Sequence, residues 1–429
     1  MTTPNRPTAA AALPSPARGP RITSIDALRG LVMFMMIFVN DLAGVPEKIV
    51  PWWLRHFPAE GSGMTVADLV FPAFLFIVGM SIPLALGSRL NRNEPPWKTL
   101  LHVVARTLSL LFIGILMVNG SPDSDQMGWS AALWSTLMFL SAIFAFCSFT
   151  PAPRSNPTAS RARIQRVVAL TVRGLGFTAL VFLAFAFRGS DGQRIVTLSP
   201  FSISTRWYGI LGLIGWAYLV AGMVFLLFRT QRTGLLGCFV LLMCLYPADK
   251  QGAFDHFWLS HYVGIGGTLG SQAAITVAGL LLATILIAPD TATTRSRTRF
   301  ALLFVTGCAA GALLLHRLYG INKNAATPSW CLWACAMTAA LWLIFHFLCD
   351  LRPAGLVAKA LAAAGGNVLL AYLLSEMLPS VIDLLHLGAW YGRLAEPGLL
   401  CAVARSTACA AVLLVLAARL NRAGFRLRL

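Results

Sequence analysis

Long apolar stretches alternate along the chain with short polar segments. The hydrocarbon core of a bilayer is about 30 Å thick, so a helix needs about 20 residues to cross it. The pattern therefore predicts an all-α, polytopic transmembrane helical bundle of about twelve spans. We place the spans near residues 24–43, 64–88, 99–119, 130–149, 166–187, 207–228, 233–247, 264–288, 299–320, 329–349, 356–379 and 397–419.

Composition agrees with this pattern and changes how the charge is interpreted. Charged residues make up 12% of the chain and hydrophobic residues 57%, whereas a soluble domain carries about 25% charged residues. A net charge of +18 would suggest a nucleic-acid partner in a soluble protein. Here the arginines lie in short loops between apolar runs, without a nucleic-acid-binding motif. We therefore expect the lipid bilayer, and no nucleic acid, as partner.

Basic residues gather in alternate loops, after the even-numbered spans and at the end of the chain. Because basic loops stay in the cytoplasm, we expect both termini there and the loop at 44–63 on the opposite face. Residues 1–20 lack the apolar core of a signal peptide and are expected to form a disordered cytoplasmic tail before a transmembrane domain at 21–429. The short loops and the lack of a leader favour a bacterial inner membrane.

Neither the cysteines nor an outer-loop histidine cluster predicts a metal site. All nine cysteines lie inside apolar runs, which argues against a disulfide framework. Cys331 and Cys335 are one turn apart without a neighbouring histidine or carboxylate. The spacing of Asp255, His256 and His261 matches no common zinc pattern. We expect no metal, and for His261 either acceptor binding or plain solvation.

The most informative polar residues surround the first two spans. Asn40 ends the first span, His56 lies in the following loop, and Asp68 begins the second span. Ionisable groups cost about 2.5–3.5 kcal/mol at the centre of a membrane helix, so such residues near helix ends suggest a polar cavity. His56 is then a candidate base, which Asp68 would hold and Asn40 would assist by orienting the substrate. The alternatives are an interfacial histidine and an Asp68 that only caps its helix with Thr65.

Polar residues later in the chain are candidates for substrate binding. Asn367, Tyr372 and Glu376 give the eleventh span a polar stripe, in which Tyr372 and Glu376 share a helical face. A hydrogen-bond clasp between helices is the alternative. Lys323, between spans nine and ten, is expected to meet an anion, and the nearby Trp330 completes the candidate set.

One ion pair is expected within the first span. Asp26 and Arg29 are three residues apart on one helical face, a spacing that allows an i,i+3 pair. We interpret this pair as structural.

Four parts of the chain carry a family resemblance: S-I-D-A-L-R-G at Ser24–Gly30, V-N at Val39–Asn40, the loop histidine, and T-V-A-D-L-V-F-P-A-F-L-F-I-V-G-M-S-I-P at Thr65–Pro83. Together they resemble the heparan-α-glucosaminide N-acetyltransferase family of membrane acetyltransferases. N-K-N at 322–324 and G-G-N-V-L-L-A-Y-L-L-S-E at 365–376 add support. In that family the loop histidine is implicated in acetyl transfer across the membrane, so the resemblance implies this role for His56, with Asn40 and Asp68 as supporting groups.

The resemblance also implies a reaction. Acetyl-CoA would be the co-substrate, with its anionic nucleotide at the arginine-rich cytoplasmic mouth, and the acceptor would be a glucosamine-type amine at the outer face. His56 would take the amine proton or carry the acetyl group transiently. Where the family has Asp-Pro-Glu-Gly, this chain has G-I-G-G-T-L-G at Gly264–Gly270. We therefore expect a smaller amino sugar or cell-wall saccharide as acceptor, and not heparan sulfate.

Two other functions stay open at this point. One is a proton-coupled secondary transporter of a sugar or related solute, in which Asp68 and Glu376 relay protons; the lack of an internal repeat argues against it. The other is acetyl transfer to a glycan hydroxyl. The sequence also leaves open whether the chain acts alone or as a homodimer.

Overall fold

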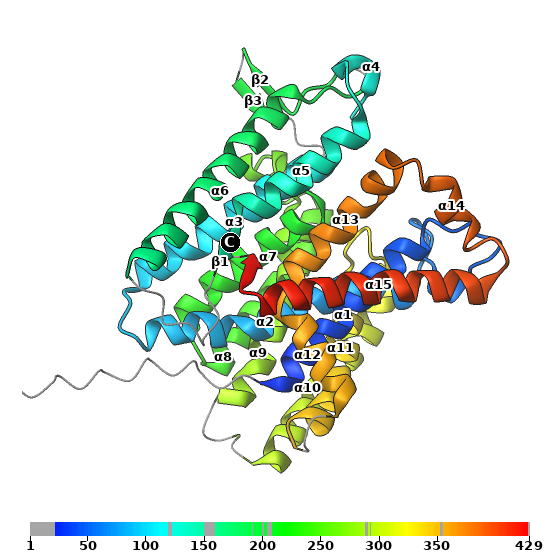
Figure 1. Ribbon diagram of the computed structural model, residues 1–429. Helices are drawn as coiled ribbons and strands as arrows, with labels where there is room; N and C mark the ends of the chain where they lie inside the picture. The colour runs from blue at the N-terminus through cyan, green and yellow to red at the C-terminus, as the bar shows by residue number, and fades with distance from the viewer. Residues whose placement is uncertain are drawn as a thin grey trace, which may run out of the picture.

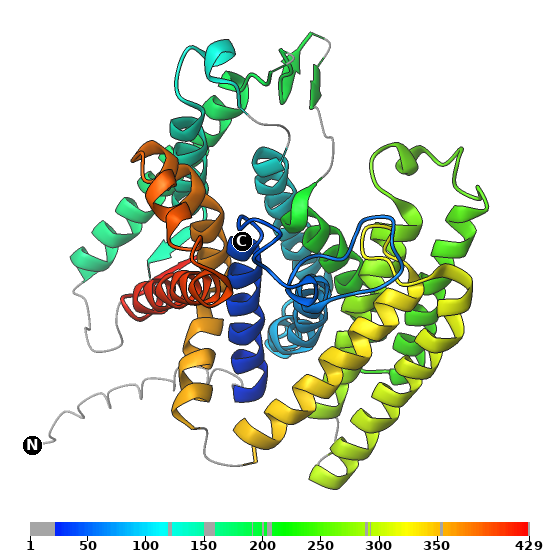
Figure 2. The same ribbon diagram turned by 90° about the vertical axis from the view of Figure 1, so that its right-hand side faces the viewer.

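The computed structural model describes residues 22–118, 122–149, 159–190, 192–199, 201–203, 208–287, 291, 293–351 and 355–427. The predicted tail at 1–20 lies outside these residues. The described chain is almost wholly helical, which confirms the predicted all-α class (Figures 1 and 2). The helices are α1 (Thr23–Leu42), η1 (Trp52–Leu54), α2 (Val66–Leu90), α3 (Pro96–Val118), α4 (Ser124–Met127), α5 (Ala131–Ala145), α6 (Ala159–Ala186), α7 (Gly209–Phe228), α8 (Arg232–Lys250), η2 (Trp258–His261), η3 (Ile265–Gln272), α9 (Ala273–Ile287), α10 (Thr294–Tyr319), α11 (Pro328–Cys349), α12 (Leu356–Ala364), η5 (Gly365–Asn367), α13 (Val368–Leu384), α14 (Gly388–Arg393) and α15 (Leu399–Arg422).

Ten helical segments in the described part of the chain are long and apolar enough to cross a membrane. The chain is therefore a multi-pass integral membrane protein. Helix α1, which carries charged residues, and helix α5, which has 15 residues, are outside that count although both lie at predicted spans. The prediction of about twelve spans is confirmed for ten. The membrane side on which the termini lie stays a prediction, as does the source membrane.

Two predicted spans contain breaks that the apolar pattern does not reveal. The span expected at 264–288 begins with the π-helix η3 and continues as α9. The span expected at 356–379 is divided into α12 and α13 by the 3₁₀ turn η5. Both breaks contain a pair of adjacent glycines, at 266–267 and 365–366. Glycine is a weak helix former, so the regular α-helix is interrupted where these pairs occur.

Helices α2 and α9 approach each other closely through glycine. A Cβ atom on Gly79 would overlap the carbonyl oxygen of Thr276, and one on Gly279 would overlap that of Phe76. Lipid provides no hydrophobic force between helices, so small residues that let backbones approach are a common means of packing. This contact fixes α2, which carries Asp68, against the segment formed by η3 and α9.

The described residues include four short strands besides the helices. Strand β1 (Cys147–Phe149) pairs antiparallel with β4 (Phe425–Leu427), and β2 (Val196–Leu198) with β3 (Phe201–Ile203). Strand β1 occupies the end of the predicted fourth span, directly after α5, which lies along α6 (Figure 1). Asn367 of η5 donates to the carbonyl of Phe425 at 3.2 Å. The end of the chain is thus held against the break between α12 and α13.

The loop after α1 is joined to the loop before α11. The backbone N–H of Gly63 donates to the carbonyl of Ile321 at 2.8 Å, and Asn322 Nδ2 donates to the carbonyl of Ala59 at 2.6 Å. Figure 2 shows these two loops close together at one end of the bundle. The pairing brings the N-K-N segment next to the histidine loop.

Candidate functional site

Three cavities follow one another through the bundle. The arginine cavity, of about 530 Å³, is lined by α1, α2, α3, α7, η5, α13 and β4. The middle cavity, of about 520 Å³, shares Met36 and Ile210 with it. The histidine cavity, of about 290 Å³, shares His56, Lys323 and Asn324 with the middle cavity. The cavities therefore form a row from the first half of α1 to the loop that follows this helix.

His56 lies at the boundary between the middle and histidine cavities, and Asp68 contacts it. The Nδ1 atom of His56 lies 2.9 Å from Oδ1 of Asp68. The Asp68 side chain is 2% exposed and that of His56 is 43% exposed, so the carboxylate is covered while the ring is accessible. Oδ2 of Asp68 accepts from the backbone N–H groups of Phe57 at 2.9 Å and Thr65 at 3.2 Å. Asp68 therefore caps α2 and contacts the imidazole at the same time.

Lys323 contacts the same pair from the opposite loop. Its Nζ lies 3.1 Å from Nδ1 of His56 and 3.5 Å from Oδ1 of Asp68. Burial lowers the pKa of Lys323, while the Asp68 carboxylate acts in the opposite direction. A neutral imidazole nitrogen carries either a proton or a lone pair, so Nδ1 donates to Asp68 or accepts from Lys323. The first arrangement leaves the lone pair on Nε2, as a general base requires.

Asn40 connects the middle cavity to the polar stripe on α13. It lines that cavity with His56, and its Nδ2 donates to Oε1 of Glu376 at 3.2 Å. Tyr372, one turn before Glu376 on α13, lines the arginine cavity. The hydrogen-bond clasp between helices, considered as an alternative for this stripe, is therefore present. A binding role for these residues stays a prediction.

The remaining candidates do not line a cavity together with His56. Asn367 lines the arginine cavity and binds β4. Trp330 is fully buried in α11, and His261 is exposed at the end of η2; neither lines any of the three cavities. Their predicted roles in substrate binding therefore stay predictions. Within the residues that the structure describes, no group of three or more His, Cys, Asp or Glu side chains is arranged to hold a metal ion.

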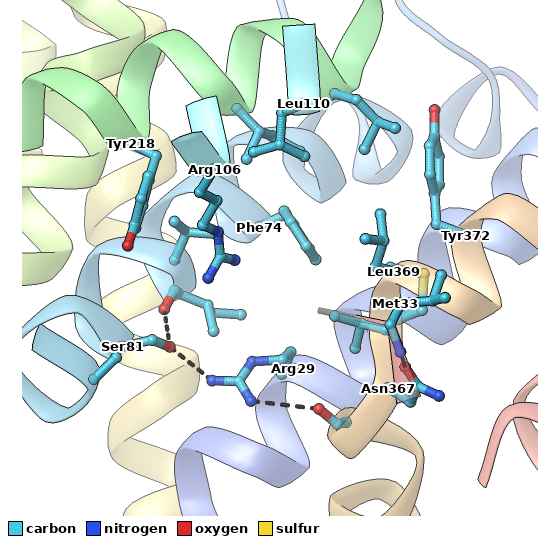
Figure 3. Close-up of a pocket in the computed structure, with 18 of the residues that line it drawn as sticks. Arg29, Met33, Phe74, Ser81, Arg106, Leu110, Tyr218, Asn367, Leu369 and Tyr372 are labelled. Carbon is cyan, nitrogen blue, oxygen red and sulfur yellow. Dashed lines mark hydrogen bonds between the residues drawn. The ribbon is translucent and has the colours of Figure 1, made fainter. Parts of the chain in front are cut away.

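The arginine cavity gathers basic side chains that are scattered in the sequence. Figure 3 shows the guanidinium groups of Arg29 and Arg106 directed into it. Arg29 donates to Asp26 at 3.0 Å, which confirms the ion pair expected within α1. It also donates to Ser81 at 2.6 Å. This second bond connects α1 to α2 at the cavity wall.

Arg106 is the arginine of this cavity for which the described residues provide no ion pair. Its guanidinium carbon lies 4.7 Å from the ring centre of Tyr218. Its Nε has no hydrogen-bond partner among the described residues, whereas Arg89 lies 3.3 Å from Glu94. A planar guanidinium that stacks on an aromatic ring suits bidentate binding of phosphate or carboxylate. The arginine cavity is therefore suited to an anionic ligand.

Three site residues are not among the candidates from the sequence. Arg106 is one of many basic residues, and only folding shows that it faces a cavity. Gln272 lines the middle cavity; a polar residue inside an apolar span was the available signal. Asn324 lines two cavities, and its only signal was the N-K-N segment.

Comparison with known proteins bears out the resemblance as a partial similarity. The chain is 38% identical over 110 residues to the heparan-alpha-glucosaminide N-acetyltransferase of Homo sapiens, which is 26% of this chain and 16% of that protein. It is 33% identical over 142 residues to the enzyme of the same name from Mus musculus, which is 32% of this chain and 21% of that protein. The chain thus matches only about a fifth of the length of these relatives.

A family model covers a larger part of the chain. The model described as a domain of unknown function, DUF5009, matches residues 21–253, which is more than half of the 429 residues. This stretch runs from α1 to the end of α8 and contains His56, Asp68 and Arg106. The chain therefore belongs to the DUF5009 family.

Proposed function

We propose that this protein is a membrane acetyltransferase that moves an acetyl group from acetyl-CoA to the amine of an amino sugar. The observation that carries the proposal is the row of three cavities, with arginine side chains at one end and a histidine–aspartate pair at the other end. The partial similarity to membrane N-acetyltransferases supports the reaction class.

The donor would enter with its nucleotide in the arginine cavity. Arg106 and Arg29 would contact its phosphates, and the thin pantetheine arm would extend through the middle cavity to His56. Arg29 and Asn40 are separated by about 16 Å along α1, at 1.5 Å per residue, so the reaction centre lies well away from the phosphates. The orientation expected from the basic loops places the arginine cavity on the cytoplasmic side, where acetyl-CoA is made.

The transfer step needs a base and a group that stabilises the oxyanion. The amine nitrogen attacks the thioester carbonyl carbon, and the new C–N bond replaces the C–S bond. Nε2 of His56 takes the amine proton and returns it to the leaving thiolate, which gives the amide and free CoA. Asp68 holds Nδ1–H, and the Lys323 ammonium stabilises the oxyanion. A transient acetyl group on Nε2 would use the same arrangement, and rapid-quench labelling of His56 distinguishes the two routes.

The histidine cavity would hold the acceptor. Its volume of about 290 Å³ is at the small end of ligand pockets, which measure about 300–1,000 Å³. This favours a single amino sugar or the end of a short saccharide. The physiological acceptor is to be found by offering a panel of such sugars.

Release of CoA thiol by the purified full chain tests the proposal. With acetyl-CoA and glucosamine we expect thiol release and an N-acetylated product, and N-blocked glucosamine should be inactive. Arg106→Leu should raise KM for acetyl-CoA about 10-fold, because one charged hydrogen-bonding group is lost. Arg166→Leu, at an exposed position of α6, should leave KM unchanged.

Two results would contradict the proposal in different ways. Product from N-blocked glucosamine would indicate hydroxyl transfer. Accumulation of sugar in vesicles without CoA, together with no thiol release from any sugar of the panel, would indicate a transporter.

A further inference from the structure

The wall of the middle cavity contains a polar side chain that plays no part in the chemistry at His56. Gln272 lines this cavity and is 7% exposed. Its Oε1 has no hydrogen-bond partner in the described part of the chain. A buried polar atom without a partner costs about 1–3 kcal/mol, and most such atoms in native proteins have a partner. A carboxamide in this state beside a cavity indicates that its partner is a ligand.

The π-helix that carries this side chain is packed against α8. Gln272 ends the π-helix η3, and Thr268, about one turn earlier, lines the same cavity. Turns of π-helix occur often at functional sites. The glycines of η3 lie directly against α8: the N–H of Gly266 donates to Oδ2 of Asp249 at 3.1 Å, and a Cβ there would meet the Cα of Tyr246. Gln272 therefore belongs to a rigid wall.

Apart from Gln272, Thr268, Asn40 and the His56, Lys323 and Asn324 side chains shared with the histidine cavity, the lining of the middle cavity is apolar. A molecule that passes from the arginine cavity to His56 must therefore be mostly aliphatic, with hydrogen-bonding groups where it passes η3. The pantetheine arm of a CoA thioester fits this requirement, because it is mostly aliphatic and carries two secondary amides and one hydroxyl group. The apolar wall includes Met36, Val39, Val70, Phe71, Ile210 and Leu213.

We propose that the Gln272 carboxamide hydrogen-bonds a secondary amide of the pantetheine arm, with Thr268 as a second contact. The inference rests on the proposed function and extends it, because it makes η3 the element that selects CoA thioesters over other anionic nucleotides. A carboxamide pairs with a secondary amide either as acceptor or as donor. The pairing is therefore available whichever way the side-chain amide is turned.

Equilibrium binding to the purified full chain tests the inference with two probes. Acetyl-CoA contains the arm, and adenosine 3′,5′-bisphosphate lacks it. Gln272→Met keeps the length of the side chain and removes its polar atoms. It should weaken acetyl-CoA binding about 5- to 10-fold, the effect of one hydrogen bond, and leave bisphosphate binding unchanged. Gln126→Met, at an exposed glutamine of α4, should change neither affinity.

The unfolding temperature separates a ligand contact from a structural one. Gln272→Met removes a buried polar atom without a partner, so the ligand-free protein should be at least as stable as the wild type. Its increase in unfolding temperature on addition of acetyl-CoA should be smaller. Thr268→Val should also weaken acetyl-CoA binding, by a smaller factor, and leave bisphosphate binding unchanged. If Gln272→Met does not fold, this variant tests the inference.

The inference is overturned if wild type and Gln272→Met bind acetyl-CoA equally. It is also overturned if Gln272→Met binds acetyl-CoA and the bisphosphate more weakly by the same factor. In those cases the proposed function still stands, provided that the wild type binds acetyl-CoA. If the wild type does not bind acetyl-CoA at all, both the inference and the proposed function fail.

Discussion

The chain contains two histidine–aspartate pairs with nearly the same geometry and different surroundings. Nδ1 of His56 lies 2.9 Å from Asp68, and Nδ1 of His346 lies 2.8 Å from Asp350. The His56 ring borders two cavities, whereas the His346 side chain is 1% exposed and stacks on Trp342, with 5.2 Å between the ring centres. The comparison teaches that access, and not the short N–O distance, distinguishes a candidate site from a structural contact.

The second pair joins the ends of two helices. Asp350 follows α11 and accepts from the backbone N–H of Ser24 at 3.0 Å, near the start of α1. A carboxylate is favoured at that end of a helix. Burial alone would raise the pKa of Asp350, but the hydrogen bonds from His346 and Ser24 lower it. This pair therefore stabilises the contact between α1 and α11.

The largest expected effect distinguishes the two histidines. His56→Ala should reduce kcat about 10³-fold, because general acid–base catalysis contributes about 10²–10⁴-fold, while acetyl-CoA binding persists. His346→Ala should keep most of its kcat and lose stability, because it leaves space beside Trp342. Steady-state kinetics and unfolding temperatures check both variants. Similar kcat values for His56→Ala and His346→Ala would contradict the assignment of His56 as catalytic and His346 as structural.

A smaller effect is expected at the two carboxylates. Asp68→Asn should lower kcat about 10²-fold, because an amide that donates to Nδ1 favours the tautomer without a lone pair on Nε2. Asp350→Asn should leave kcat near the wild-type value. The measurement is kcat at saturating acetyl-CoA, and an equal loss in both variants would argue against a special role for Asp68.

The first pair shows what the sequence reveals about the site. One loop connects these residues: Asn40 precedes it, His56 lies within it and Asp68 follows it. Their proximity in space is therefore predictable. Lys323 is 267 residues away from His56, and no local pattern indicates that their loops are joined. Gln272 and Arg106 reach the cavities only through the packing of helices that the apolar pattern does not specify.

The fold shows the same division between local and long-range information. Apolar runs predict membrane helices because the length and apolar character of each run are local properties, and ten of the expected spans are confirmed. The Asp26–Arg29 pair is also local and is confirmed at 3.0 Å. The breaks at η3 and η5 are missed because hydrophobicity continues through them. The shortness of α5 is missed because strand β1 depends on a partner far away in the chain.

A third effect tests Lys323, the cation beside the first pair. Lys323→Met should lower kcat about 10-fold, less than the loss of a full oxyanion donor, because Asp68 already offsets part of the charge. Affinity for acetyl-CoA should not change. Lys98→Met, at an exposed position, is the matched control. A change in KM for acetyl-CoA alone would place Lys323 in donor binding.

The smallest effect concerns pH and the second pair. Because the pKa of Asp350 is lowered in the folded protein, its stabilising effect is present above the ordinary value of about 3.9 and is lost as pH falls through the lower folded value. Asp350→Asn should therefore reduce the unfolding temperature by a few degrees at neutral pH, since about 1 kcal/mol shifts it by about 2–4 °C. The difference from wild type should disappear at acidic pH. A difference that persists there would contradict this explanation.

Transfer across a sealed membrane tests the central claim most directly. The full chain is reconstituted in vesicles, with labelled acetyl-CoA only on the side of the arginine cavity and glucosamine only on the side of His56. We predict labelled N-acetylglucosamine on the His56 side with the wild type and none with His56→Ala. Absence of label there, with acetyl-CoA intact on the other side, would contradict a route through the three cavities.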